Sequence, residues 1–290
     1  MSSYSAHLIT HNRSRYDYSA LLNDVDHVLT RGGGKKTNVH SADKFALADI
    51  SSLDALAFKL ASAVVSFMWS RHLERATVSG SLRRLSGFRD ALDFLSRVAR
   101  ISLMVNSRNL LQARIACLRS LNISYSHLGA WESAASSGSR FALVLEDDGI
   151  LSSRGDLEAT LDFIATFAKE ERETLINISQ SFKFYTLGVN HIVLSSSSEK
   201  VGQTSQEVIF SNSPFTNTLC ATVLSVPLVR SLISFTERSM KSKLWRSVAI
   251  DFQVNRYIME HAKARALECA HLSPGIINQG SMLKTASNRI

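Results

Sequence analysis

Three consecutive carboxylates, Glu146, Asp147 and Asp148, directly follow the apolar run Phe141-Ala-Leu-Val-Leu145. An apolar run of this length with Val and Leu inside it predicts a strand buried on both faces, with the acids at its C-terminal end. Ligands bind at that edge of open α/β sheets, and clustered acids repel one another unless a cation or a proton compensates. Mg²⁺ and Mn²⁺ prefer oxygen ligands and are commonly shared with substrate phosphates. The run therefore predicts a metal site that docks a nucleotide diphosphate.

A plainer interpretation is that the acid run is a solvated strand end that caps the following helix. Gly149 is expected to permit the sharp turn by which the chain leaves the sheet. Asp156 is expected to cap a helix that runs to about Arg172 with its apolar residues on one face. Both interpretations of the acids remain open at this point.

A fourth carboxylate, Asp251, stands in the apolar stretch that begins at Val248. Burying a carboxylate without a partner is costly, so Asp251 is expected to be paired or functional. As a general base it would take the proton from an acceptor hydroxyl. The alternative is that Asp251 caps a helix that continues through Ile258.

The segment from His7 to Tyr16 begins apolar and continues as a polar, basic turn, which predicts a strand, a loop and then a helix. Arg13 and Arg15 would lie at the strand's C-terminal end, where a guanidinium group can pair with phosphate. A solvated basic loop is the alternative. The later glycine run before Thr37 is not a phosphate loop, because Lys35 occupies the place of the required glycine.

The chain has 33 basic and 25 acidic residues among 290, a formal charge of +8. Such a charge attracts anionic partners, which include nucleotide-sugars, membrane surfaces and nucleic acid. Basic residues are spread over the whole chain, so nucleic acid is not an expected partner.

Several features favour a cytoplasmic protein. The most apolar stretch, Leu53 to Trp69, is interrupted by charges and falls short of the roughly 18 apolar residues that a membrane span needs. The N-terminus lacks the apolar segment of a secretory signal. Cys117, Cys220 and Cys269 are odd in number and widely spaced, which predicts reduced core thiols. The positive charge leaves open a peripheral contact with the inner face of an anionic membrane.

The segment from Ser126 to Leu151 carries a Ser-His-x-x-x-Trp helix, followed about a dozen residues later by the apolar strand and Glu-Asp-Asp. In order, spacing and residue types it resembles glycosyltransferase family 25, the lipopolysaccharide-type and collagen-type galactosyltransferases. Two further segments resemble the family, the N-terminal strand with Asn-Arg-Ser and the terminal element from His271 to Ser281. The helical region between them departs from the family pattern.

The resemblance implies an inverting transfer of a hexose, galactose favoured, to a hydroxyl of a glycan or glycoconjugate acceptor. The donor would be a nucleotide-sugar, with a UDP-sugar favoured, and the cofactor a divalent metal, Mn²⁺ or Mg²⁺. The residues assigned to the site are Asp251 and Asp148 as catalytic groups; Asn12, Arg13, Arg15, Ser126, His127, Gln279 and Ser281 as donor-binding groups; and Glu146, Asp147, Asp148 and His271 as metal ligands.

The expected fold is α/β, a GT-A-like nucleotide-sugar-binding mixed sheet flanked by helices, with an added helical region. Residues 1–50 would start the GT-A-like domain and residues 121–290 would complete it. Residues 51–120 would form a mostly helical insertion, broken near Ser79-Gly80 and Ser86-Gly87, that either packs on the domain or recognises an acceptor or partner.

Two other functions remain open from the sequence. Glu-Asp-Asp-Gly is similar to the Asp-x-Asp-Gly of haloacid-dehalogenase-type phosphohydrolases, although Glu146 replaces the nucleophilic aspartate. The arginine-rich helices are also compatible with a nucleic-acid or membrane-surface binding module in which the acid run is incidental.

Overall fold

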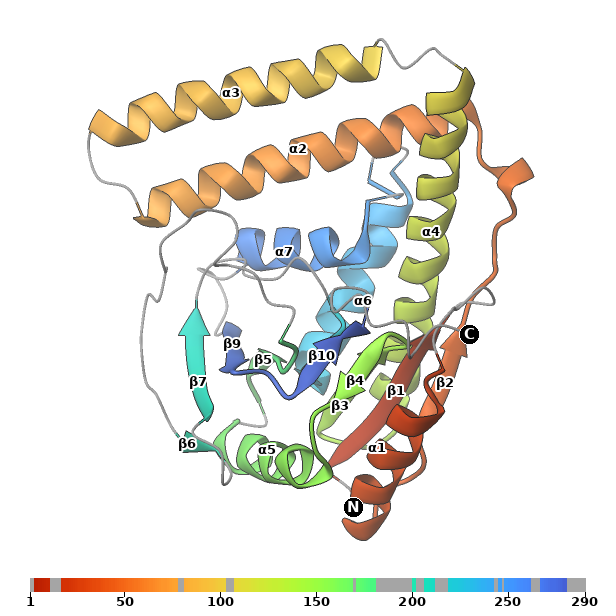
Figure 1. The fold of residues 1–290 in the computed structure, drawn as a ribbon, viewed down its shortest axis with the longest axis vertical. Coiled ribbons are helices and arrows are strands. Elements are labelled where there is room, and N and C mark those ends of the chain that lie inside the picture. The colour runs from red at the N-terminus through yellow and green to blue at the C-terminus, as the bar shows by residue number, and fades with distance from the viewer. Residues whose placement is uncertain are drawn as a thin grey trace.

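The protein has an α/β fold (Figure 1). The computed structural model describes residues 3–10, 17–77, 81–102, 107–168, 171–180, 200–201, 206–211, 219–242, 245–246, 248–261 and 267–280. Its helices are α1 (Ser19–Arg31), α2 (Ser52–Thr77), α3 (Ser81–Ser102), α4 (Ser107–Ser136), α5 (Arg154–Phe167), α6 (Val226–Met240) and α7 (Ile250–His261), with a 3₁₀ turn η1 (Leu47–Asp49). Its strands are β1 (Tyr4–Thr10), β2 (Asn38–Ser41), β3 (Phe141–Glu146), β4 (Gly149–Leu151), β5 (Glu173–Asn177), β6 (Lys200–Val201), β7 (Gln206–Ser211), β8 (Ala221–Ser225), β9 (Leu267–Ser273) and β10 (Ile277–Gln279).

Eight of the strands form one mixed sheet in the order β2-β1-β3-β8-β5-β9-β7-β6, and β4 pairs with β10 separately. Strand β1 runs parallel to both β2 and β3, and β5 runs parallel to β9. Strand β8 is antiparallel to its neighbours β3 and β5, which therefore share one direction. The expected mixed sheet flanked by helices is confirmed at this level.

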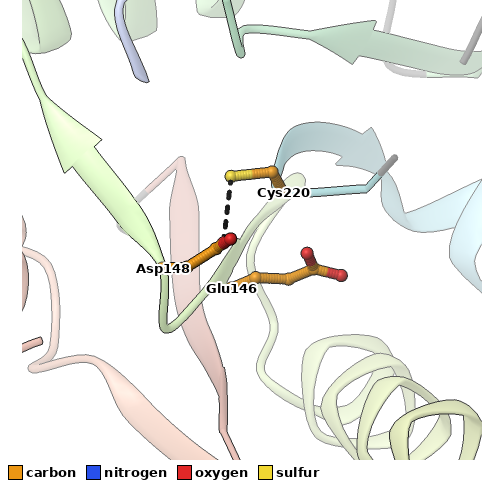
Figure 2. Close-up of side chains that lie close together, drawn as sticks. All are labelled: Glu146, Asp148 and Cys220. Carbon is orange, nitrogen blue, oxygen red and sulfur yellow. Dashed lines mark hydrogen bonds between the residues drawn. The ribbon is translucent and has the colours of Figure 1, made fainter. Parts of the chain in front are cut away.

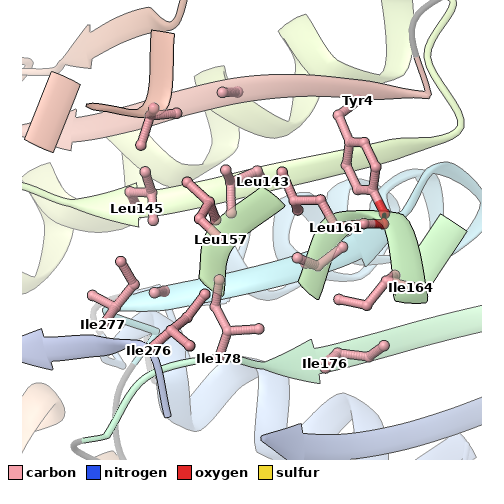
Figure 3. Packing of buried hydrophobic residues seen from close by; sticks show 14 of the residues in the cluster. Tyr4, Leu143, Leu145, Leu157, Leu161, Ile164, Ile176, Ile178, Ile276 and Ile277 are labelled. Carbon is pink, nitrogen blue, oxygen red and sulfur yellow. Dashed lines mark hydrogen bonds between the residues drawn. The ribbon is translucent and has the colours of Figure 1, made fainter. Parts of the chain in front are cut away.

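Strand β3 is buried on both faces, as its apolar run predicts. Leu143 and Leu145 belong to the core cluster that includes α1 and α5, where Leu157 packs (Figure 3). Ala142 and Val144 belong to the opposite cluster, formed with α4, α6 and α7. Alternate side chains of a strand point to opposite faces, so β3 lies between two layers of helices.

The helix after the acid run begins earlier than expected and is not capped by an acid. The N-cap of α5 is Ser153, whose Oγ accepts a hydrogen bond from the backbone N–H of Asp156 at 3.1 Å. Asp156 lies in the first turn, where a negative charge is favourable near the positive end of the helix dipole. The interpretation of the acid run as a helix cap is therefore wrong.

Helices α2 and α3 form an outer layer that lies beyond α7, away from the sheet, while α4 runs from the level of this layer down to the sheet (Figure 1). Ala61 and Val65 of α2 pack with Val248, which comes just before α7. The predicted break at Ser86-Gly87 is wrong, since α3 continues through these residues. Helix α4 crosses residue 120 without interruption, so it belongs to both the helical region and the sheet-bearing part. Among the described residues, no helix is long and apolar enough to span a membrane.

Candidate functional site

The acid run lies at the edge of the sheet where most of its strands end. Strands β1, β2, β3, β5 and β9 all run in one direction, so their C-terminal ends meet at this edge. The antiparallel strand β8 begins there, and the backbone N–H of Glu146 donates to the carbonyl of Cys220 at 2.8 Å. The edge thus brings together residues from distant parts of the chain.

The three acids of the run have different surroundings. The carboxylate of Asp147 accepts a hydrogen bond from Thr10 Oγ1 at 2.9 Å, and its backbone N–H donates to the carbonyl of Ile9 at 3.0 Å. Asp147 is thereby held against the end of β1. Asp148 is buried, and its backbone carbonyl accepts from the N–H of Gly280 at 2.7 Å.

Glu146, Asp148 and Cys220 form a group whose ligand atoms all lie within 4.8 Å of one another (Figure 2). The thiol of Cys220 donates to Asp148 Oδ1 across 3.7 Å. Burial, together with the charges of Glu146 and Asp148, raises the pKa of this thiol well above its usual value. Two carboxylates and a sulfur could hold a divalent ion, which would also offset the repulsion between the acids.

Gly149 is closely packed at the end of the acid run. A Cβ atom there would lie 3.2 Å from the carbonyl oxygen of Glu146 and equally close to side chains of Leu21 and Ile277. Its φ is not positive, since the described glycines with positive φ are Gly33 and Gly138. The chain does turn between the end of β3 at Glu146 and the start of β4 at Gly149, and the close contacts leave little room for a side chain at Gly149.

Glu146 also contacts a buried histidine of α4. His127 Nε2 lies 3.3 Å from Glu146 Oε1, and because a carboxylate only accepts, this nitrogen is the donor. The His127 ring packs near the ring of the fully buried Trp131, with 5.9 Å between the two ring centroids. His127 Nδ1 has no hydrogen-bond partner within the described part of the chain. The predicted Ser-His-x-x-x-Trp helix thus positions the first acid of the run.

Two more histidines form a pair, and one of them, His40, is a neighbour of His127. His7 of β1 and His40 of β2 are joined by a hydrogen bond of 3.0 Å between ring nitrogens. Burial, with a smaller contribution from His40, lowers the pKa of His7 to about 4. Burial and the neighbouring His127 likewise lower the pKa of His40. Neither His7 nor His40 therefore offsets the charge of the acid run at neutral pH.

Glu146 lines a cavity of about 200 Å³ together with Asp251 of α7; the other lining residues are Ser120, Ile123, Leu219, Ala249 and Ile250. Burial raises the pKa of Asp251 to about 7, and the charge of Glu146 acts in the same direction. A hydrogen bond of 2.9 Å from the backbone N–H of Phe252 to Asp251 Oδ1 partly offsets these effects. Asp251 lies in the first turn of α7, which begins at Ile250, and it lines the cavity from there.

The other predicted site residues lie at different places. Gln279 pairs with Gly149 across β10 and β4, which brings it beside the acid run. His271 is buried on β9, three strands from β3 and thus roughly 14 Å away, and is not part of the possible metal-binding group. Ser126 Oγ accepts from the N–H of Ala42 at 3.0 Å and ties α4 to the chain after β2. Four of the predicted residues lie outside the described part of the chain: Asn12, Arg13, Arg15 and Ser281.

Sequence reasoning missed the position of Cys220 beside the acids and treated it as a core thiol. The thiol is indeed buried, as are those of Cys117 and Cys269. Its place beside the acids follows from the pairing of Ala221 with Leu145, since this register sets Cys220 opposite Glu146. The partners of a strand cannot be predicted from one sequence. The position of Cys220 directly before an apolar strand does indicate that its side chain could lie at an end of the sheet. Thr10 was missed for the same reason.

The chain was compared with known proteins. No protein-family model matches it, and no curated protein matches it. The functional assignment therefore depends on the arrangement of the site.

Proposed function

We propose that this protein is a metal-assisted glycosyltransferase that moves a hexose, galactose favoured, from a nucleotide diphosphate sugar to a hydroxyl of a glycan or glycoconjugate. A UDP-sugar is the favoured donor. The proposal is supported above all by Glu146, which belongs both to the possible metal-binding group and to the cavity that contains Asp251. One carboxylate therefore connects a place for a diphosphate with a place for a reacting hydroxyl.

The residues at the end of β3 suit a divalent ion. Glu146 and Asp148 would supply oxygen ligands and Cys220 a sulfur ligand. When bound, the ion would neutralise the charge that develops on the leaving diphosphate. The two carboxylates suit Mn²⁺ or Mg²⁺, while the sulfur favours a softer ion than Mg²⁺.

Asp251 is the proposed general base. A base works best when its pKa lies near the working pH, and the pKa of this carboxyl is about 7. Its place in the cavity would let it accept the proton of the acceptor hydroxyl while that oxygen attacks the sugar. A direct attack of this kind inverts the sugar in a single displacement, which is the outcome that the family resemblance implies.

The size of the cavity suits one sugar ring. At about 200 Å³ it is smaller than the pockets of roughly 300–1,000 Å³ that enclose drug-sized ligands. The nucleotide part of the donor would then lie along the edge of the sheet. Gln279 is beside this edge, and the resemblance places Asn12, Arg13 and Arg15 near the nucleotide.

The test is thermal unfolding of the purified protein with a panel of nucleotide-sugars, with and without Mn²⁺, followed by an assay for nucleotide release with glycan acceptors. A donor present at 100 times its Kd adds about 2.7 kcal/mol to the free energy of unfolding, which a melting curve resolves. The matched variants are Asp148→Asn, which removes a proposed ligand, and Asp147→Asn, whose carboxylate faces Thr10 instead.

The expected result is metal-dependent stabilisation by one nucleotide-sugar that is lost in Asp148→Asn and retained in Asp147→Asn. Equal loss in both variants would contradict the assignment of ligands. Absence of stabilisation by every nucleotide-sugar would overturn the proposal. Release of phosphate from simple phosphate esters would instead favour the phosphohydrolase alternative.

A further inference from the structure

Helix α3 carries an exposed apolar stripe on its outer face. Phe88, Leu92 and Leu95 are 67%, 51% and 60% exposed. Their spacing of four and then three residues places them on one side of the helix. We call these three side chains the α3 stripe. Half of the exposed large apolar side chains among the described residues thus lie together on this one helix.

The α3 stripe is not the surface by which the helix packs on the protein. Phe94 packs against Phe67 of α2, with ring centroids 5.1 Å apart. Figure 1 shows α3 on the side of α2 that faces away from the sheet. The helix therefore has one apolar side toward α2 and a second, the α3 stripe, toward the outside.

Two arginines border the α3 stripe. Arg89 and Arg100 are eleven residues apart, close to three helical turns, so they lie along the same side of the helix. Neither makes an ion pair with any residue that the structure describes. Arg97, in contrast, is held by Asp93 at 2.8 Å. The positive charges of Arg89 and Arg100 are therefore available to contact an anionic partner.

A lipid surface suits this combination better than the other candidate partners. A helix that lies on a membrane buries Phe and Leu side chains at the headgroup boundary, while flanking arginines contact anionic headgroups. Nucleic acid would use the arginines but would leave the leucines without a partner. Two antiparallel copies paired along the stripe would cover the leucines but would give the two arginines no anionic surface to contact.

We propose that the outer face of α3 binds the surface of an anionic membrane through the α3 stripe, Arg89 and Arg100. The net charge of +8 on the chain acts in the same direction. Binding at this face requires neither a nucleotide-sugar nor Glu146. Membrane binding and the proposed transfer reaction can therefore be tested independently.

The test is co-sedimentation of the full chain with vesicles of phosphatidylcholine alone and with vesicles of phosphatidylcholine and phosphatidylglycerol in equal amounts. We expect binding to the anionic vesicles, weakened by added salt because the arginine contacts are screened. The variant Leu92→Gln/Leu95→Gln should bind about tenfold more weakly or worse, since both leucines lose their apolar contact. The control Leu53→Gln changes an equally exposed leucine at the start of α2 and should bind normally.

A second pair of variants addresses the charges and does not alter the apolar residues. Arg89→Gln/Arg100→Gln should weaken binding to anionic vesicles, whereas Arg97→Gln should have little effect because Arg97 is already paired. Circular dichroism verifies that each variant is folded. Equal binding to both vesicle types, no binding to either, or equal weakening in Leu53→Gln would overturn the proposal. Conversion of a dimer to a monomer by the leucine variant would overturn it in favour of a second copy of the chain.

Discussion

His127 and Glu146 meet at the end of β3, with 3.3 Å between Nε2 and Oε1, and the histidine side chain is fully buried. The carboxylate is 23% exposed and faces the cavity. Helix α4 thus fixes one side of Glu146 from the interior and leaves the other side available to a ligand. A buried donor of this kind would orient the carboxylate toward a bound metal ion.

Removing this donor should weaken the proposed metal site. His127→Phe fills the space without a hydrogen-bond donor, and we expect metal affinity to fall roughly 10- to 100-fold, as for other residues that orient ligands. His127→Gln keeps an N–H at a similar reach and should retain most of the affinity. Titration of each variant with Mn²⁺, followed by melting temperature, measures the difference. Equal affinities in His127→Phe and the wild type would exclude this positioning role.

The sequence predicts those parts of the site that are local in the chain. The strand that ends in Glu146 and the helix that carries His127 follow from apolar periodicity. Each of these patterns is complete within a short segment. The mixed sheet is predictable in the same sense, because short apolar runs alternate with helical segments.

The rest of the site depends on which strands are neighbours. Cys220 reaches Asp148 because β8 is inserted between β3 and β5, and this order is not encoded in any local pattern. The same order separates His271 from the acids by three strands. The break expected at Gly87 did not occur because a single glycine costs a helix only about 1 kcal/mol, which packing on α2 can offset.

Cys220 should act as a metal ligand that is detectable by spectroscopy. Co²⁺ bound by a thiolate absorbs in the near ultraviolet through charge transfer from sulfur to metal. We expect this band in the wild type and in the control Cys269→Ser, and its absence in Cys220→Ser. Because the pKa of the thiol is raised, metal binding must displace its proton and should tighten as pH increases. Identical Co²⁺ spectra for all three proteins would show that sulfur does not bind the ion.

Gly275 should be essential for the chain to pass the end of β5. A Cβ atom at this position would lie 2.4 Å from the carbonyl carbon of Ser179, and the backbone cannot yield at that distance. We expect Gly275→Ala to lower the free energy of unfolding by roughly 3 kcal/mol, as severe overpacking does. Gly155→Ala is the matched control, because a Cβ there meets no atom within 4 Å and alanine favours the helix α5. Chemical denaturation measures the free energy of unfolding of both variants, and similar values for the two would refute the predicted clash.

Asp251 should lower stability at neutral pH while it supports activity. Its carboxyl has a pKa of about 7 in the folded protein and 3.8 in the unfolded chain, so between these values the folded state holds a proton that the unfolded state has lost. The free energy of unfolding therefore falls as pH rises from about 4 to about 7, by up to a few kcal/mol. Asp251→Asn removes this dependence and should become more stable than the wild type across that window, whereas the exposed Asp93→Asn should follow the wild type.

The same Asp251→Asn variant should lose the increase of kcat/KM through pH 7 that deprotonation of a general base produces. Denaturant titrations at several pH values measure the first effect and initial rates measure the second. A variant that gains stability and remains fully active would show that Asp251 has no catalytic role.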